Sequence, residues 1–244
     1  MQEWEKGTHY LYGASYYAKL GDNYFEAADA TMHRLASILV RKFAPQSSLD
    51  IGCAHGLLVH WLRQMGVSAY GVDVSDYAFS TAPEHSRAYL TKLDIEIDRI
   101  QFNDETLDLV TALEVLEHLT NLEYALAEIK RVLKPGGLFY VTTPLPLTDS
   151  KLGQFLLGRG WRRLDSTHVN VHGRHYWKCK LEESGFSYET MLAETFRGTP
   201  TGFWITKHLQ GIPGGNTLRA YLAGTYMFRR LLPENNNDNI YANE

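Results

Sequence analysis

The feature that most constrains the fold is an apolar segment that runs into a loop with glycine at both ends. Residues 49–56 read Leu-Asp-Ile-Gly-Cys-Ala-His-Gly, and an apolar helical pattern follows at once. Glycine is used where the backbone turns tightly or must approach a ligand without a Cβ in the way. A strand, a glycine loop and a helix, placed early in an alternating β/α chain, are typical of a nucleotide site. The segment therefore predicts a strand-loop-helix unit that binds a nucleoside-containing ligand.

The residues around this loop favour one kind of adenosine ligand. The next apolar segment ends at Asp73, where a carboxylate can accept hydrogen bonds from both hydroxyls of a ribose. The loop has Gly52 and Gly56 but lacks the third glycine of the dinucleotide pattern GxGxxG, and Asp50 leads into it. A pyrophosphate prefers backbone N–H groups and a helix N-terminus, whereas an acid suits a ligand with a cationic end. We therefore expect S-adenosylmethionine, which carries an ammonium and a sulfonium.

Three motifs in order resemble those of the class I S-adenosylmethionine-dependent methyltransferases. The first is the glycine loop, in which Ala54 and His55 replace the commoner glycine and small residue. The second is Leu-Glu-Val-Leu-Glu-His-Leu at 113–119, which follows a predicted strand at 107–112. The third is a helix, then Lys-Pro-Gly-Gly at 134–137, then a strand ending at 143. The resemblance covers roughly residues 48–143 and implies a doubly wound, mostly parallel α/β sheet of Rossmann-like type, with S-adenosylmethionine as cofactor and S-adenosylhomocysteine as product.

The resemblance also implies which residues contact the cofactor. Family members place an acid beside an apolar residue opposite the adenine, and Asp94 with Ile95 fits this role; Glu96 is the rival, because the register is uncertain by about two residues. N-terminal tyrosines often cover the cofactor in the family, so Tyr16 and Tyr17 are candidates for a lid; the alternative is a pair of helices packed on the core. The expected cofactor residues are Asp50, Gly52, Cys53, Ala54, His55, Gly56, Asp73, Val74, Asp94, Ile95, Leu113, Glu114, Val115, His118 and Tyr17.

Methyl transfer is an in-line displacement, so most of the catalysis is positioning of donor and acceptor. A base is needed only where the acceptor atom is protonated at the working pH, and histidine is the best-matched base. His118 belongs to the second motif, a position that in the family more often lines the cofactor pocket than takes part in chemistry. His168 resembles a histidine that many relatives carry before the next helix. We expect His168 to be the base on the acceptor side; the alternative is a structural histidine bonded to the backbone.

Some side chains have both a functional and a structural interpretation. His168, His172 and His175 have the spacing of zinc ligands on one helical face, but Val169 and Gly173 disfavour a helix there. Nothing acidic and no cysteine is spaced to complete the ligand shell, so we expect no metal.

Within the glycine loop, His55 either meets the carboxylate of the methionine moiety or faces solvent. Cys53 is expected to be a small buried filler rather than a nucleophile, because nothing near it in sequence would lower its pKa. The arginines at 159, 162 and 163 form either a solvated face or a contact with an anionic acceptor.

Composition limits the other possibilities. The net charge of −4 disfavours a general nucleic-acid binder. Two cysteines do not make a disulfide scaffold, and no apolar leader is visible at the start, so a cytoplasmic setting is expected. No run approaches the ~18 apolar residues of a membrane span.

The expected organisation is an N-terminal helical cap at 1–45 and a cofactor-binding core at 46–196, with an acceptor-side insertion at about 145–175. A helical segment without a final strand follows at 197–232, with a helix over 218–232, and then a disordered tail at 233–244. The predicted function is methyl transfer to a small molecule, on an oxygen of a sugar, glycan precursor or natural product. The alternatives are a catalytically silent cofactor-binding module and a nicotinamide-dependent oxidoreductase, the latter disfavoured by the missing GxGxxG.

Overall fold

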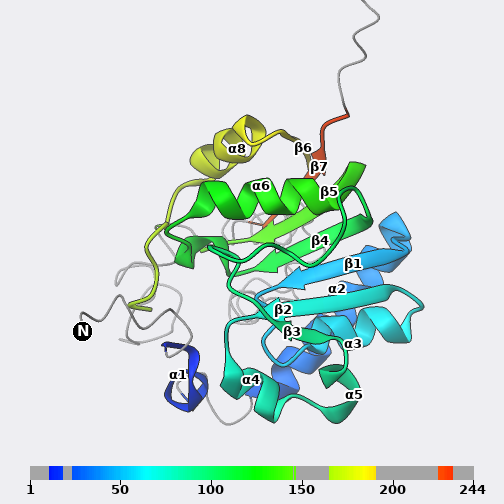
Figure 1. Ribbon diagram of the computed structural model, residues 1–244, viewed down its shortest axis with the longest axis vertical. Coiled ribbons are helices and arrows are strands. Elements are labelled where there is room, and N and C mark those ends of the chain that lie inside the picture. Colours follow the sequence, from blue (N-terminus) through cyan, green and yellow to red (C-terminus); the bar gives the residue numbers. More distant parts are fainter. Residues whose placement is uncertain (1–10, 19–23, 145, 147–164, 191–224, 233–244) are drawn as a thin grey trace, which may run out of the picture.

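A seven-stranded sheet organises the part of the chain that the computed structural model describes, which is residues 11–18, 24–144, 146, 165–190 and 225–232 (Figure 1). The strand order is β3-β2-β1-β4-β5-β7-β6. Strands β1 to β5 pair in parallel, and β7 is antiparallel to both of its neighbours. The strands are β1 Ser47–Ile51, β2 Ser68–Asp73, β3 Leu90–Lys92, β4 Leu107–Leu113, β5 Leu133–Thr142, β6 Phe186–Thr190 and β7 Thr225–Arg230.

Helices cover both faces of this sheet. One face packs against α6 and α8 and the other against α2 and α3, while α4 and α5 lie at the β3 edge (Figure 1). Among the described helices, none combines the length and the apolar character needed to cross a lipid bilayer. The helices are α1 Ala14–Ala18, α2 Tyr24–Phe43, α3 Leu57–Gln64, α4 Asp76–Thr81, α5 Glu84–Arg87, the 3₁₀ helix η3 Leu116–His118, α6 Leu122–Val132 and α8 Arg174–Glu183.

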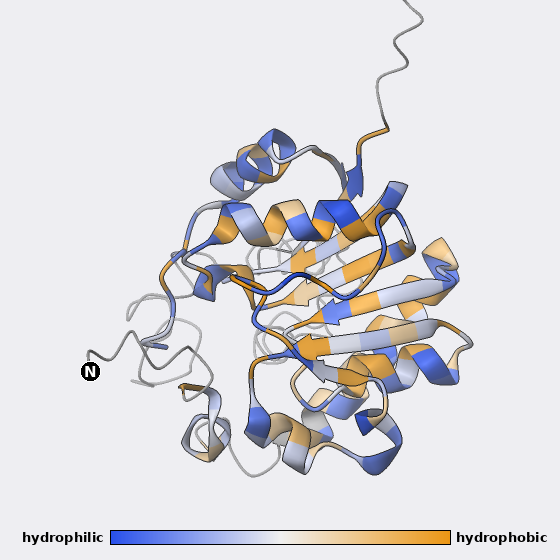
Figure 2. Ribbon diagram, viewed as in Figure 1, coloured by the Kyte–Doolittle hydropathy of each residue, from blue (hydrophilic) through white to orange (hydrophobic). Residues whose placement is uncertain are grey.

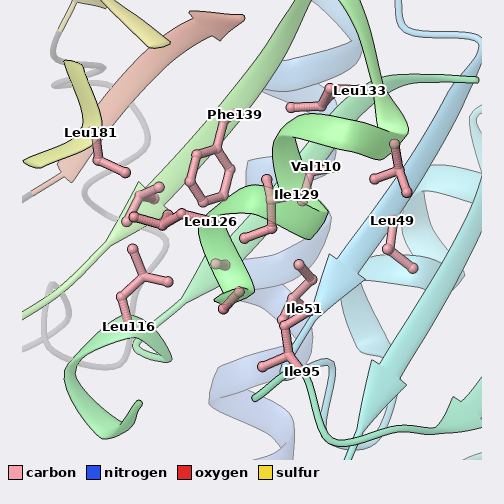
Figure 3. Packing of buried hydrophobic residues seen from close by; sticks show 14 of the residues in the cluster. Leu49, Ile51, Ile95, Val110, Leu116, Leu126, Ile129, Leu133, Phe139 and Leu181 are labelled. Atoms are coloured by element: carbon pink, nitrogen blue, oxygen red, sulfur yellow. The ribbon is translucent and has the colours of Figure 1, made fainter. Parts of the chain in front are cut away.

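The central strands are buried on both faces, as crossovers through helices require. Alternate residues of β5 show this: Phe139 belongs to the core under α6, and Tyr140 to the core under α2 and α3. Figure 3 shows Leu126 and Ile129 of α6 directed toward the strands that carry Phe139 and Val110. The strands at the centre of the sheet are mostly hydrophobic along their length, whereas α6 carries both hydrophobic and hydrophilic residues (Figure 2). The alternating β/α pattern in the sequence thus produced the expected doubly wound, mostly parallel sheet.

Most predicted elements occur within a few residues of their expected positions. Ser75 caps α4, because its Oγ accepts a hydrogen bond of 3.0 Å from the Ala78 N–H. Helix α8 begins directly after Gly173, and β6 follows it from Phe186. Most of the insertion at 145–175, residues 197–224 and the tail at 233–244 lie outside the described residues.

Two predictions near the end of the sheet are wrong. The helix expected over 218–232, with no final strand, is replaced by β7 at Thr225–Arg230. Tyr226 and Phe228 face one core and Met227 the other, so this segment is buried on both faces and pairs with β5 and β6. A segment that mixes apolar and basic residues resembles an amphipathic helix in sequence. Here the segment lies between β5 and β6, where only an extended strand can pair with both neighbours.

The fifth strand also begins earlier than predicted. It starts at Leu133 instead of after the Lys-Pro-Gly-Gly turn. The pairing with β4 shifts between Leu107↔Leu133 and Leu109↔Leu138, so the residues from Lys134 to Gly137 form an irregularity within the strand. A bulge of this kind accommodates a proline, which cannot donate to the ladder.

Candidate active site

A cleft of about 420 Å³ opens at the carboxyl ends of β1, β2 and β4. The chain reverses its direction of winding beside β1, and ligands of open α/β sheets bind at such a point. The volume lies within the range of small-molecule sites, roughly 300–1,000 Å³. With the exception of Gly56, every residue predicted to contact the cofactor lines this cleft, as does His168.

The glycine loop forms the floor of the cleft. Gly52 has φ +68 and Gly56 has φ +71, values that residues with a side chain rarely adopt. The N–H groups of Gly52 and Cys53 donate to the carbonyl of Val72, at 2.8 and 3.1 Å, which fixes the loop to β2. A Cβ on Gly52 would lie 2.3 Å from a methyl group of Val115. Gly56 serves the packing instead, since its Cβ would meet Leu90 at 2.8 Å.

Asp73 joins the glycine loop to the end of β2. Its Oδ2 accepts from the Ala54 N–H and its Oδ1 from the Ser75 N–H, both at 2.8 Å. Burial raises the pKa of Asp73, and these backbone hydrogen bonds oppose the rise. Each carboxylate oxygen has a second lone pair, so the group can hold the loop and still accept hydrogen bonds from a ligand in the cleft.

Asp50 is a buried acid at the same end of the cleft. Burial raises its pKa to about 7; the hydrogen bond from Thr111 Oγ1, of 2.6 Å, opposes the rise, and the nearby Asp73 adds to it. A cation bound beside such a group would favour its ionised form. Burial raises the pKa of the Cys53 thiol, and the negative charges of Asp73 and Asp50 raise it further. A buried thiol that stays protonated agrees with the interpretation of Cys53 as a small buried filler.

The two acids after β3 have different surroundings. Glu96 is buried, and its Oε1 accepts from the Thr120 N–H at 2.5 Å and the Asn121 N–H at 2.7 Å, at the start of α6. Asp94 Oδ1 accepts from the Glu96 N–H at 3.0 Å. Glu96 therefore stabilises the α6 N-terminus, and Asp94 remains the better candidate for contact with an adenine.

N-terminal tyrosines form one wall of the cleft. Tyr12, Tyr16 and Tyr17 line it, and the Tyr17 ring lies 4.9 Å from the His55 ring. His55 is only 7% exposed, so the interpretation of a solvent-facing residue is wrong. Burial lowers the pKa of His55, which favours its neutral form. Tyr12 was not predicted; Ser75 Oγ donates to its carbonyl at 2.6 Å and thereby holds it at the cleft.

The second motif is held in an unusual backbone conformation. Glu114, directly after β4, has φ +55, and its N–H donates to the Thr142 carbonyl at 2.9 Å. Positive φ at a residue other than glycine is uncommon and clusters at functional sites. The turn directs the following 3₁₀ helix η3, with His118, along the edge of the cleft.

The structure brings His118 and His168 together but not the three histidines considered as a metal site. The rings of His118 and His168 lie 4.7 Å apart. His172 stacks on Tyr176 at 3.8 Å and His175 lies on α8 beside Cys179, and neither lines the cleft.

Asp165 and Thr167 complete the histidine end of the cleft. Thr167 Oγ1 lies 2.8 Å from His118 Nδ1 and donates to Asp165 Oδ1 at 2.6 Å. Burial opposes ionisation of Asp165, but hydrogen bonds from Thr167 and the charges of the two histidines outweigh it and lower its pKa. Asp165 and Thr167 were not among the predicted site residues, because nothing in the linear sequence relates them to His118. The arginines at 159, 162 and 163 lie outside the described residues.

Comparison with known proteins agrees with this geometry. A family model described as a methyltransferase domain matches residues 21–190. The ubiquinone biosynthesis O-methyltransferase of Rhizobium rhizogenes is 36% identical over 98 residues, 39% of this chain and 40% of that protein. The human mitochondrial ubiquinone biosynthesis O-methyltransferase is 31% identical over 173 residues, 64% of this chain and 45% of that protein. The chain thus spans less than half the length of these curated relatives.

Solved structures share the fold at low sequence identity. The YcgJ protein of Bacillus subtilis superposes with a TM-score of 0.54 at 16% identity, over 82% of this chain and 100% of that one. The [4+2]-cyclase SpnF superposes with a TM-score of 0.53 at 20% identity, over 82% of each chain. At such low identities the similarity shows the fold alone, and the reaction has to be inferred from the residues of the site.

Proposed function

The chain belongs to the class I S-adenosylmethionine-dependent methyltransferases, and on this basis we propose that it transfers a methyl group to an oxygen atom of a small molecule. The observation that carries the proposal is the arrangement of the cleft, in which the carboxylates of Asp50 and Asp73 lie at the glycine loop and the imidazoles of His118 and His168 lie side by side at the other end. The acids Asp50 and Asp73 suit a cationic donor with a ribose. The imidazoles of His118 and His168 suit an acceptor that must lose a proton.

The residues at the acidic end fit S-adenosylmethionine. Gly52 lines the cleft, and its lack of a Cβ lets Val115 pack against the loop. Asp50 offers a carboxylate to an ammonium group, and Asp73 offers lone pairs to ribose hydroxyls. When bound, the cofactor supplies an electrophilic methyl carbon on a positively charged sulfur. The chain itself has to hold that methyl group in line with the acceptor and exclude water, and Tyr12, Tyr16 and Tyr17 are placed to do this.

At the other end, the acceptor oxygen would lie beside His118 and His168. We assign the acceptor's proton to His168, which lines the cleft next to the second imidazole. His118 would orient the acceptor, because its own ring is fixed through Thr167. Relatives named ubiquinone biosynthesis O-methyltransferase favour oxygen as the acceptor atom. A sugar, a glycan precursor or a natural product with free hydroxyls fits such a site.

The test combines binding with turnover. Calorimetry with S-adenosylhomocysteine should show one site, and purified protein should release S-adenosylhomocysteine from S-adenosylmethionine with members of a panel of hydroxylated compounds. His168→Ala should lower turnover at least tenfold and leave affinity for S-adenosylhomocysteine unchanged, while the control His172→Ala, outside the cleft, should change neither. If His168→Ala lowered turnover and the affinity for S-adenosylhomocysteine equally, the assignment of His168 as the base would be wrong.

Two outcomes would favour the alternatives. Tight binding of S-adenosylhomocysteine without turnover of any acceptor would indicate a silent cofactor-binding module. Binding of a nicotinamide coenzyme in place of S-adenosylhomocysteine would contradict the assignment of the cleft.

A further inference from the structure

The carboxylate of Asp165 lies beside the two imidazoles of the cleft. Asp165 lines the cleft together with His118 and His168. Its charge interacts with both imidazoles, and the interaction with His168 is the stronger of the two. The His168 N–H also donates to the Asp165 carbonyl, at 3.4 Å. The local backbone therefore keeps this acid close to the residue to which we assign the acceptor's proton.

Hydrogen bonds from Thr167 fix this carboxylate in its ionised form. The N–H and the hydroxyl of Thr167 both donate to Asp165 Oδ1, at 3.0 and 2.6 Å. Burial opposes ionisation, but these bonds and the nearby imidazoles outweigh it and hold the pKa of Asp165 below its ordinary value. Hydrogen bonds to the charged form and a positive charge nearby both favour a carboxylate over a carboxylic acid. Asp165 therefore keeps its negative charge at neutral pH.

Thr167 joins three side chains of the site through one hydroxyl group. A threonine hydroxyl has one proton to donate and two lone pairs that can accept. Its proton goes to Asp165, so its oxygen accepts from His118 Nδ1, at 2.8 Å, and Nδ1 bears the hydrogen. The Tyr12 hydroxyl also forms a hydrogen bond with Thr167, which uses the second lone pair. One hydroxyl thereby fixes the carboxylate, the tautomer of His118 and the N-terminal wall of the cleft.

The ring of His118 faces protein groups on two sides. Its Nδ1 donates to Thr167, and its Nε2 lies 4.0 Å from Oε1 of the buried Glu117. The Val169 N–H donates to the Glu117 carbonyl at 2.8 Å, so the segment that carries His168 is bound to η3. This engagement of His118 agrees with its role in orienting the acceptor and with His168 as the group that takes the proton.

A proton on His168 creates a cation inside the cleft. The attraction between this cation and Asp165 is mutual, because a carboxylate that ionises more readily beside an imidazolium stabilises that imidazolium equally. Opposite charges also attract more strongly in a cleft than in bulk water. Among the described residues that line the cleft, neither lysine nor arginine occurs, so no fixed positive charge opposes the cation. Asp165 is thus placed to stabilise the protonated base.

We propose that Asp165 and Thr167 are positioning residues of the methyl transfer: Asp165 stabilises the imidazolium that forms on His168, and Thr167 holds this carboxylate and the His118 ring in place. The inference rests on the proposed transfer to oxygen. The O–H bond of the acceptor breaks, its proton goes to His168, and its electron pair stays on the oxygen, which bonds to the methyl carbon. The electron pair of the broken carbon–sulfur bond stays on sulfur, and His168 later releases its proton to water. Asp165 stays ionised throughout.

Other ionisable groups also face the imidazoles. Glu117 faces His118 from η3, and Tyr12 lies edge-on to the same ring at 5.8 Å. Burial raises the pKa of Tyr12 to about 12, so this group stays neutral where histidines titrate. Asp73 lies close enough for its charge to act on Tyr12. The carboxylates that act on the imidazoles are thus Asp165 and Glu117, and Asp165 can be neutralised separately.

The first experiment needs no acceptor. Heteronuclear NMR of the histidine ring nitrogens reports the tautomer of His118 and the pH at which His168 titrates. In Asp165→Asn the midpoint of the His168 titration should fall by about one pH unit, because the imidazolium loses its counter-charge. Thr167→Val should abolish the preference of His118 for the Nδ1–H tautomer, and Thr167→Ser, which restores a hydroxyl, should recover it. Asp76→Asn, at an exposed acid that pairs with a surface lysine, should change neither.

Circular dichroism and the affinity for S-adenosylhomocysteine show whether each variant is folded. A folded Asp165→Asn protein in which the His168 midpoint does not move overturns the role of Asp165. A folded Thr167→Val protein in which His118 keeps its tautomer overturns the role of Thr167.

The second experiment measures turnover with an acceptor found in the panel of hydroxylated compounds. Asp165→Asn should lower kcat roughly tenfold or more and leave the KM for the acceptor unchanged. The acidic limb of the pH profile of kcat should move to lower pH, because His168 without its counter-charge gives up its proton more readily. Thr167→Val should lose turnover, and Thr167→Ser should recover most of it.

The outcomes separate this inference from the proposed function. An acidic limb that does not move in Asp165→Asn, or equal losses of kcat and of affinity for S-adenosylhomocysteine, overturns the inference and leaves the methyl transfer intact. A protein that turns over no acceptor contradicts the proposed function, and the NMR titration still decides whether Asp165 stabilises a protonated His168.

Discussion

Asp73 is the residue whose replacement tests the cofactor site most directly. Its two carboxylate oxygens accept hydrogen bonds of 2.8 Å from the Ala54 and Ser75 N–H groups, and both have lone pairs left for a ribose. Asp73→Ala removes the link between the glycine loop and β2 together with the proposed ligand contact. We therefore expect two losses, one of protein stability and one of cofactor affinity.

The geometry sets the size of both losses. Hydrogen bonds to a charged group contribute about 1.5–3 kcal/mol each. The carboxylate is partly desolvated, and burial raises its pKa, so its removal regains part of that energy. A net destabilisation of about 1–3 kcal/mol is expected. The ribose contacts add a loss of binding energy of about 1–3 kcal/mol, which corresponds to a roughly 5- to 150-fold weaker affinity.

Calorimetry with S-adenosylhomocysteine measures the affinity and thermal unfolding measures the stability. Asp76→Ala serves as the matched control, because Asp76 is an exposed acid three positions further on that pairs only on the surface, with Lys92. Asp73→Asn separates the two effects: one amide oxygen can still accept from one N–H, but the NH₂ group faces the other N–H as a second donor. A folded Asp73→Ala protein with unchanged affinity would refute the ribose assignment.

Three further variants extend the test. Because the pKa of Asp50 is raised to about 7, its carboxylate is largely protonated below that pH. The affinity for S-adenosylmethionine, measured by calorimetry, should therefore rise between pH 6 and 8 in the wild type and stay constant in Asp50→Asn. A wild-type affinity that does not change over this pH range would contradict this expectation. Gly52→Ala places a Cβ 2.3 Å from a valine methyl group and should lower the free energy of unfolding by about 1–3 kcal/mol more than Gly66→Ala, which has the same sign of φ and open space; equal losses would argue against the clash. Glu96→Ala should lower the free energy of unfolding by about 2–4 kcal/mol in denaturant, since it removes the hydrogen-bond acceptor at the start of α6. Asp94→Ala should chiefly weaken cofactor binding. The reverse pattern would assign the adenine contact to Glu96 and the structural role to Asp94.

Local sequence patterns predicted the sheet, the cleft and its acidic end well, because each of those features is encoded within a few residues. Gly52 follows its strand directly, and Asp73 is the last residue of the next strand. Parallel strands bring such positions to one edge of the sheet, so order along the chain is enough to place them.

The features that sequence did not predict depend on contacts between distant segments. Glu117 and His168 meet because the backbone of Val169 bonds to Glu117, and nothing near either residue signals this contact. His55 is buried only because Tyr17 and Phe25 pack against it. Thr225–Arg230 became a strand because two others leave space for it, which overrides its local pattern.

The position of β7 has a consequence for how the protein is made. This strand comes last in the described chain but lies inside the sheet, between β5 and β6. While the polypeptide emerges from the ribosome, the free side of β5 has no neighbour, and β6 cannot join the sheet at all. A nascent chain in which the glycine loop has already formed therefore still exposes the unpaired edge of β5, which can pair with other chains. This edge is covered only after Thr225–Arg230 has been synthesised.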